Sequence, residues 1–315
     1  MEFRTIVDIP ESQWKIEPME RMLFVGSCFA DNIGKRFTDE HFRTVVNPYG
    51  VMYNPASVLH TVERLMEDNA MPFQEDKQGT AVFTLGTNHV YILKETGEIV
   101  DNCRKRPQRL FQEKELTIDE CADYLRRAIE CIHARFPKVR FILTVSPIRY
   151  RKYGYHGSQL SKATLLLSID KLINDLRRRA ATGAAPAQDG QGIPLTPNSQ
   201  HPTPLSTQHP TPLSIQHPTP INYFPSYEIM NDELRDYRFY KPDMLHPSDQ
   251  AVDYIFERLA DAYFSDATRS FVKEWEPIRE ALNHRPLHPE SEEYQRFRQQ
   301  TEERLRAFEQ RFAKE

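Results

Sequence analysis

Residues 22–30 read MLFVGSCFA, and this short stretch predicts both a strand and the turn that leaves it. Met22 to Val25 form an apolar run that suits a buried strand, and Gly26 marks its end. The residues from Phe29 to Phe37 then have a spacing compatible with a helix. Ser27 therefore stands where a strand gives way to a helix. In α/β proteins this is the carboxyl edge of the sheet, where functional sites are built.

Strand-like and helix-like patterns alternate along the rest of the chain. Strands are expected at 43–46, 81–85, 89–95 and 139–145, and helices at 117–136, 160–180, 253–264 and from Pro55 onward. Strands separated by helices of this length predict a parallel sheet with helices on both faces. We therefore expect an α/β fold, a three-layer α/β/α sandwich around a flavodoxin-like parallel sheet.

Residues 182–221 break this pattern with the near-repeats QHPTPLST, QHPTPLSI and QHPTPI. Such a proline-rich segment loses backbone donors and has too few apolar residues for a core, so a polyproline-like or disordered insert is expected. Partner docking and histidine-based metal capture are the functional alternatives to a surface loop without a role.

The last residues, 290–315, are strongly charged and carry a sparse apolar stripe. This pattern predicts a long amphipathic helix, either docked on its own domain or used for oligomerisation. We thus expect one domain over residues 1–265, interrupted at 182–221, and a C-terminal helical extension over 266–315. The stripe consists of Tyr294, Phe297, Leu305, Phe308 and Phe312.

Composition excludes several classes of protein. A formal net charge of -4 gives no electrostatic basis for binding nucleic acid. No apolar run approaches the length of a membrane span, and the N-terminal residues lack the pattern of a signal peptide, so the cytoplasm is the expected compartment. The 4 cysteines are too few and too scattered for a disulfide scaffold or a zinc site.

A serine nucleophile needs a base, and the base needs a group that orients it. Residues 241–247 read KPDMLHP, in which Asp243 and His246 are three apart. In a tight turn the carboxylate can hold the imidazole Nδ1–H while Nε2 faces Ser27. Each of the two features, taken alone, also has a purely structural explanation. Ser27 is a favoured helix N-cap, and the spacing of Asp243 and His246 is also typical of an acidic surface turn.

Taken together, GSCFA at 26–30 and D-x-x-H-P at 243–247 resemble the first and last sequence blocks of SGNH hydrolases. The pentapeptide is the signature of the GSCFA family, in which Gly26-Ser27-Cys28 replaces the usual G-D-S. The resemblance spans residues 20–265 apart from the insert. It implies a serine-nucleophile ester hydrolase that uses Ser27, His246 and Asp243, without a metal or organic cofactor.

The same resemblance implies the class of substrate, a small-molecule ester or an O-acylated carbohydrate. An acyltransferase with the same triad and a catalytically silent binding module are the alternatives.

The resemblance also implies an oxyanion hole made from two backbone N–H groups and an asparagine side chain. The N–H groups are those of Ser27 and of Gly50 in the segment NPYGVMYNP. Asn88 in Gly86-Thr87-Asn88 is the candidate asparagine, and Asn47 and Asn54 are fallback donors.

Two further segments, SPIR at 146–149 and the Ser161-Lys162 pair, also look like family segments. Arg149 follows a predicted strand, so it is expected at the same edge as Ser27. It either binds an anionic group of the substrate or forms a structural ion pair.

Cys28 is intrinsically a stronger nucleophile than serine near neutral pH. However, consecutive residues at a helix start point roughly 100° apart, so only one of the two can face His246. The family resemblance selects Ser27. Cys28 is then expected to pack inward as a small apolar group.

Overall fold

The computed structural model describes residues 4–101, 103, 106–182 and 219–312. The insert predicted at 182–221 therefore lies almost wholly outside the described residues.

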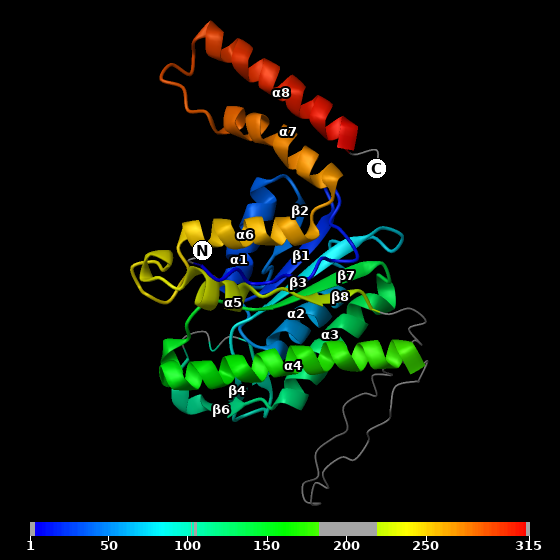
Figure 1. Ribbon diagram of the computed structural model, residues 1–315, viewed down its shortest axis with the longest axis vertical. Helices are drawn as coiled ribbons and strands as arrows, with labels where there is room; N and C mark the ends of the chain where they lie inside the picture. Colours follow the sequence, from blue (N-terminus) through cyan, green and yellow to red (C-terminus); the bar gives the residue numbers. More distant parts are fainter. Residues whose placement is uncertain (1–3, 102, 104–105, 183–218, 313–315) are drawn as a thin grey trace, which may run out of the picture.

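A five-stranded parallel sheet forms the centre of the molecule (Figure 1). Its strands pair in the order β2-β1-β3-β7-β8, with parallel pairing throughout. Counted within this sheet, that order is 2-1-3-4-5, which is the flavodoxin-like arrangement. The strands are β1 (Arg21–Gly26), β2 (Arg43–Val46), β3 (Gly79–Leu85), β7 (Val139–Val145) and β8 (Ile221–Tyr223).

Helices cover both faces of this sheet, as Figure 1 shows. Leu23 and Val25 of β1 join an apolar cluster with α2, α3 and α4, whereas Met22 and Phe24 join a second cluster with α1 and α6. Each strand is thus buried on both sides, which explains why the strands appear in the sequence as continuous apolar runs. The predicted three-layer α/β/α fold is confirmed. The helices are α1 (Cys28–Asp39), α2 (Pro55–Glu67), α3 (Ile118–Arg135), α4 (Gly154–Thr182) and α6 (Asp249–Tyr263).

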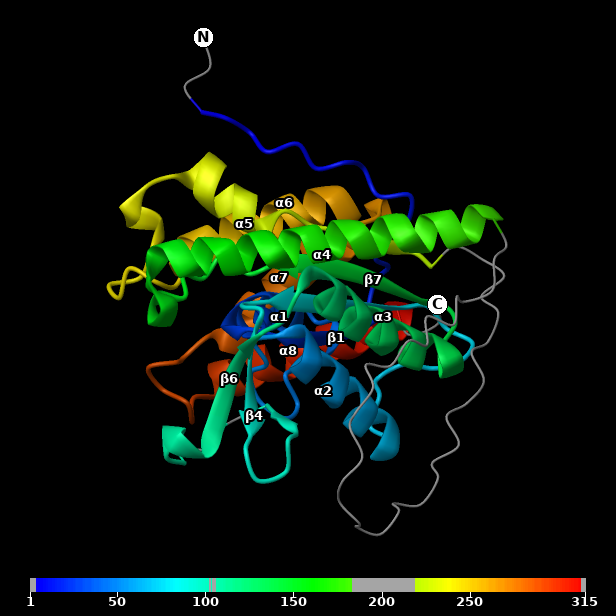
Figure 2. The ribbon, with the colours of Figure 1, turned by 90° about the horizontal axis from the view of Figure 1, so that it is seen from below.

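A second, antiparallel sheet in the order β5-β4-β6 lies outside the central one (Figure 2). The strand predicted at 89–95 is present as β4 (His89–Leu93), paired with β5 (Ile99–Val100) and β6 (Phe111–Glu115). Its placement departs from the single-sheet expectation for a physical reason. Only residues 86–88 separate it from β3. A parallel neighbour needs a crossover of a dozen or more residues, so this strand has to leave the sheet.

The remaining elements are short. They are η1 (Gln108–Leu110), η2 (Arg151–Tyr153), α5 (Ser226–Glu228), the π-helical η3 (Ile229–Leu234) and η4 (Tyr237–Phe239).

The C-terminal extension is a pair of helices, α7 (Asp266–Asn283) and α8 (Glu292–Phe312), at one end of the molecule (Figure 1). The rings of Phe308 and Phe312 both lie 4.9 Å from that of Phe271. Trp275 fixes the pair to the domain, because its Nε1 donates to the carbonyl of Asp39 at 2.7 Å. The helix therefore docks on its own chain, and oligomerisation through it stays a prediction.

Gly26 and Gly50 both have positive φ angles, of 147° and 96°, but their surroundings differ. A Cβ at Gly26 would lie 2.1 Å from the carbonyl oxygen of Thr84, whereas nothing lies within 4 Å of one at Gly50. We predict that Gly26→Ala lowers the free energy of unfolding by more than about 3 kcal/mol, because backbone must move. Gly50→Ala should lose only about 1 to 2 kcal/mol from its φ angle. Urea unfolding of both variants measures this, and equal losses would contradict the crowding argument.

Candidate active site

Ser27 follows directly on β1 and begins helix α1. Its φ and ψ of -64° and 175° are those of an N-cap, and its Oγ accepts the N–H of Phe29 at 3.2 Å. The same Oγ lies 3.1 Å from the Oγ1 of Thr84 on β3, and the residue is only 2% exposed. The capping role considered from the sequence is therefore real. It also fixes the hydroxyl at the carboxyl edge of the sheet.

Asp243 and His246 form a hydrogen-bonded pair in the loop before α6. Asp243 Oδ2 lies 2.6 Å from His246 Nδ1, and Asp243 Oδ1 accepts the N–H groups of His246 at 3.0 Å and Leu245 at 2.9 Å. These backbone donors, followed by the imidazole, lower the pKa of Asp243 to about 2. The carboxylate is thus ionised and holds one ring nitrogen, which leaves Nε2 of His246 for other partners.

The backbone around this pair is tightly held. Met244 has a φ of 56°, a left-handed conformation that closes the turn between Asp243 and His246. The N–H of Lys241 donates to the carbonyl of His246 at 2.8 Å, and the N–H of Arg149 donates to the carbonyl of Leu245 at 3.0 Å. The loop is therefore attached to the segment that follows β7.

A pocket of about 220 Å³ brings three of the predicted residues together. Ser27, His246 and Arg149 all line it, together with Gly86 and Ser146 at the ends of β3 and β7. The pocket therefore lies where the carboxyl ends of parallel strands meet, which is the expected place for a site in this fold.

The structure does not assemble the predicted oxyanion donors at this pocket. The N–H of Ser27 donates to the carbonyl of Thr84 at 3.0 Å, and that of Gly50 to the carbonyl of Asn47 at 2.8 Å. Asn88 is buried and its Nδ2 donates to the carbonyl of Leu116 at 2.8 Å. Neither Gly50 nor Asn88 lines the pocket.

The two fallback asparagines are also engaged elsewhere. Asn47 Oδ1 accepts the N–H of Gly26 at 2.9 Å, and Asn47 Nδ2 donates to Asp31 at 2.6 Å. Asn54 caps α2 by accepting the N–H of Ser57 at 2.9 Å. These side chains shape the backbone beside the pocket.

Tyr53 and Tyr150 are among the residues at the pocket that were not identified from the sequence as functional. Burial raises the pKa of Tyr53 well above its ordinary value, so its hydroxyl remains a donor across the neutral range. The sequence offered no signal for it, because a tyrosine in a turn-rich segment can point in any direction.

Cys28 also lies at the pocket, which differs from the expectation that it packs inward only. It is half-buried against the apolar cluster that includes Phe29, but its sulfur lies 3.7 Å from the Tyr53 hydroxyl and lines the pocket. The reason is its position as the first residue of α1, on the rim of the strand–helix turn.

A stack of rings joins the small sheet to the pocket. The His89 ring lies 3.6 Å from that of Tyr153, nearly parallel at 8°. Tyr153 stacks on Tyr150 at 5.5 Å, and Tyr150 meets Tyr53 edge-on at 5.8 Å. Burial lowers the pKa of His89, which favours the neutral imidazole in this stack.

Arg149 is held by aromatic rings. Its guanidinium lies 4.6 Å from the ring centroid of Tyr240, 5.5 Å from that of Tyr155 and 5.7 Å from that of Tyr237. Within the described residues it forms no ion pair with a carboxylate, so the structural ion pair considered from the sequence is not observed. Cation–π contacts position this charge at the pocket instead.

Ser161 and Lys162 of α4 form hydrogen bonds to the residues that directly follow β3 and β7. Ser161 Oγ accepts the N–H of Asn88 at 3.0 Å and lies 3.0 Å from Thr87 Oγ1, just after β3. Lys162 is buried, and its Nζ donates to the carbonyl of Ser146 at 2.8 Å, just after β7.

Burial lowers the pKa of Lys162 to about 7. The unfolded chain keeps this proton up to an ordinary lysine pKa of about 10.4. Between these values the unfolded state binds more protons, so stability due to this group rises with pH. We predict that Lys162→Met removes a rise of about 1.4 kcal/mol per pH unit between about pH 7.5 and about pH 9.5. Urea unfolding of both proteins across this range measures it. Parallel profiles would contradict the pKa assigned to Lys162.

The fold and the pocket define an α/β protein with a serine and a histidine–aspartate pair at the carboxyl edge of its sheet. The chain belongs to the GSCFA family, whose sequence profile matches residues 21–78, 74–180 and 213–259. A profile described as "GSCFA domain protein, C-terminal domain" matches residues 275–314. No curated protein sequence matches the chain.

Solved structures that resemble this one include two esterases. An acetyl esterase mutant with an acetate ion has a TM-score of 0.40 at 10% identity, covering 81% of this chain and 99% of its own. A carbohydrate esterase of family 3 from Talaromyces cellulolyticus has a TM-score of 0.37 at 9% identity, with coverage of 81% and 99%.

Two other kinds of feature are absent from the described residues. No helix there is long and apolar enough to cross a membrane. No group of three or more His, Cys, Asp or Glu side chains in the same part of the chain is arranged to hold a metal ion.

Proposed function

We propose that this protein is a serine-nucleophile ester hydrolase whose triad is Ser27, His246 and Asp243. The observation that carries the proposal is the 2.6 Å pair of Asp243 and His246 beside a pocket that Ser27 also lines. A histidine whose Nδ1 is held by an ionised carboxylate is the arrangement that a serine nucleophile requires.

In the proposed reaction, Ser27 Oγ attacks the ester carbonyl carbon while His246 Nε2 takes the hydroxyl proton. The tetrahedral intermediate collapses, the bond to the alcohol oxygen breaks, and His246 returns the proton to that oxygen. Water then attacks the acyl-enzyme in the same way and releases the acid. Asp243 holds the imidazole in the required tautomer and stabilises its cationic form.

For the oxyanion we propose donors that lie at the pocket. The N–H of Cys28 is in the first turn of α1, where the helix dipole favours negative charge. The Tyr53 hydroxyl, 3.7 Å from the Cys28 sulfur, is the second donor. Ser27 N–H could join them only by leaving the carbonyl of Thr84.

The size of the pocket supports a short acyl group. Its volume of about 220 Å³ lies below the range of about 300 to 1,000 Å³ typical of sites for drug-sized ligands. Tyr53 and Tyr150 offer ring faces and hydroxyls at its wall, and Arg149 offers a charge. We therefore propose a small ester or an O-acylated carbohydrate as the substrate.

The triad predicts strongly non-additive losses of activity. Ser27→Ala should lower kcat on short-chain aryl esters or acetylated sugars by about 10³-fold or more, and adding His246→Ala should cost little further. Asp243→Asn should be less severe than Ser27→Ala, because it disturbs the tautomer of His246 but leaves both the nucleophile and the base in place. Steady-state kinetics of the single and double variants measures this. Independent, multiplying losses would show that these residues do not form one site.

A second prediction separates Ser27 from its neighbour Cys28. A fluorophosphonate should label the wild-type protein and Cys28→Ala at Ser27, and should leave Ser27→Ala unlabelled. Cys28→Ala should retain most activity and lose about 1 kcal/mol of stability, since it removes a small, half-buried group. Mass spectrometry of the treated proteins identifies the labelled residue, and thermal unfolding measures the loss of stability. Retained activity in Ser27→Ala with loss in Cys28→Ala would make this a cysteine enzyme, and an unlabelled wild-type protein would favour a binding module.

A further inference from the structure

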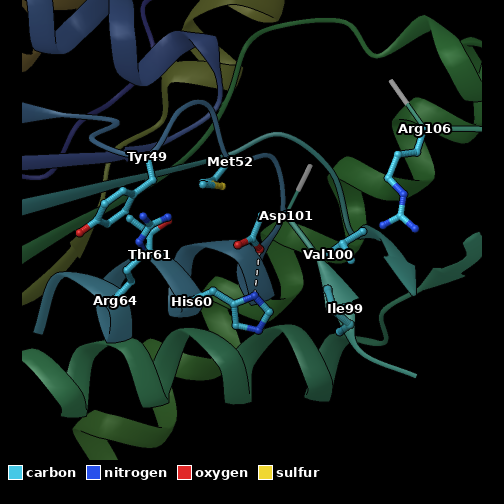
Figure 3. A pocket seen from close by; sticks show the side chains of 9 residues that line it. All are labelled: Tyr49, Met52, His60, Thr61, Arg64, Ile99, Val100, Asp101 and Arg106. Carbon is cyan, nitrogen blue, oxygen red and sulfur yellow. Dashed lines mark hydrogen bonds and ion pairs between the residues drawn. The ribbon is translucent and has the colours of Figure 1, made fainter. Parts of the chain in front are cut away.

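A second cavity, of about 390 Å³, is lined by the residues drawn in Figure 3. It is bounded by the turn after β2, by α2 and by β5 with the residues that follow it. Met52 lines this cavity, whereas the next residue, Tyr53, lines the catalytic pocket. The two spaces therefore share one short segment of the chain at their boundary.

Positive charge is held in a fixed position at one part of this cavity. The guanidinium of Arg64 lies 3.9 Å from the ring centroid of Tyr49. Asp68 fixes the pair, since it accepts the Tyr49 hydroxyl at 2.5 Å and lies 3.6 Å from Arg64 Nε. Holding both groups in place reduces the conformational entropy that an arginine would lose on binding a ligand.

His60 and Asp101 face one another in the middle of the cavity, as Figure 3 shows. His60 Nδ1 lies 2.9 Å from Asp101 Oδ1, and this hydrogen bond raises the pKa of His60. The hydrogen bond turns Asp101 Oδ1 toward the imidazole and leaves Nε2 of His60 for other partners. The positive charge in the cavity comes from its two arginines.

Arg106 supplies the charge that remains uncompensated. It lines the cavity apart from Arg64 (Figure 3), and within the described residues it forms no ion pair with a carboxylate. Met52, Ile99 and Val100 give the cavity apolar wall between these charges. A ligand suited to it has an oxyanion group on a compact body.

We propose that this cavity is a binding site for a small organic anion, a carboxylate- or phosphate-bearing molecule of about the size of a monosaccharide. Arg106, whose charge is uncompensated, would bind the oxyanion, Arg64 would donate to hydroxyl groups on the other side of the ligand, and Met52 would contact its body. The site does not depend on the serine chemistry, because no residue that lines it belongs to the proposed triad.

Isothermal titration calorimetry tests the proposal with glucuronate and glucose 6-phosphate as probes, and with glucose as the neutral control. At least one of the two anions should saturate the protein at millimolar concentrations or below, and glucose should bind more weakly. Arg106→Gln and Arg64→Gln should each weaken that binding roughly tenfold. Arg285→Gln, which removes an exposed arginine elsewhere, and Ser27→Ala should leave it unchanged.

The two anions distinguish the chemistry of the ligand, since binding of glucuronate alone assigns a carboxylate and binding of glucose 6-phosphate alone assigns a phosphate. Thermal unfolding without ligand confirms that each variant is folded. Absence of saturation by both anions, equal binding of glucose, or unchanged affinity in both arginine variants would overturn the proposal. Loss of binding in Ser27→Ala would place the ligand in the catalytic pocket and overturn it equally.

Discussion

The close approach of β1 and β3 at their carboxyl ends fixes the geometry on which the site depends. At Gly26 the two backbones come so near that no side chain fits, because a Cβ would meet the Thr84 carbonyl. That carbonyl accepts the N–H of Ser27, and the Thr84 hydroxyl contacts the Ser27 hydroxyl. The glycine thus lets one residue of the neighbouring strand hold both the backbone and the side chain of the proposed nucleophile.

Strands that are buried on both faces could be predicted from the sequence, because their own residues form continuous apolar runs. The apolar runs of β1 and β7 contact both core clusters, so their composition alone identified them as strands of a covered sheet. The partner of β4 could not be predicted in this way, because alternation along 89–93 fits a strand in any sheet. β8 has only 3 residues beside the proline-rich insert, too few for a periodic signal.

In the site, too, what local spacing determines could be predicted, and what long-range contacts determine could not. Asp243 and His246 meet because they are three residues apart in one turn, so local spacing was enough to predict their pairing. The direction of the Asn88 side chain depends instead on the carbonyl of Leu116, which is 28 residues away. A motif specifies the type of residue, and such long-range contacts decide where that residue points.

The ring stack from His89 to Tyr53 couples the small sheet to the shape of the pocket wall. Its first ring belongs to the small sheet, which contributes no strand to the central one, and its last ring lines the pocket that Ser27 and His246 share. Amino-acid changes on the side of the small sheet that carries the stack can therefore reshape that wall, whereas Val90 of β4 is buried in the core cluster of the central sheet and has to be kept. For divergence or directed evolution, the ring-bearing side of the small sheet is a place where ligand preference can change.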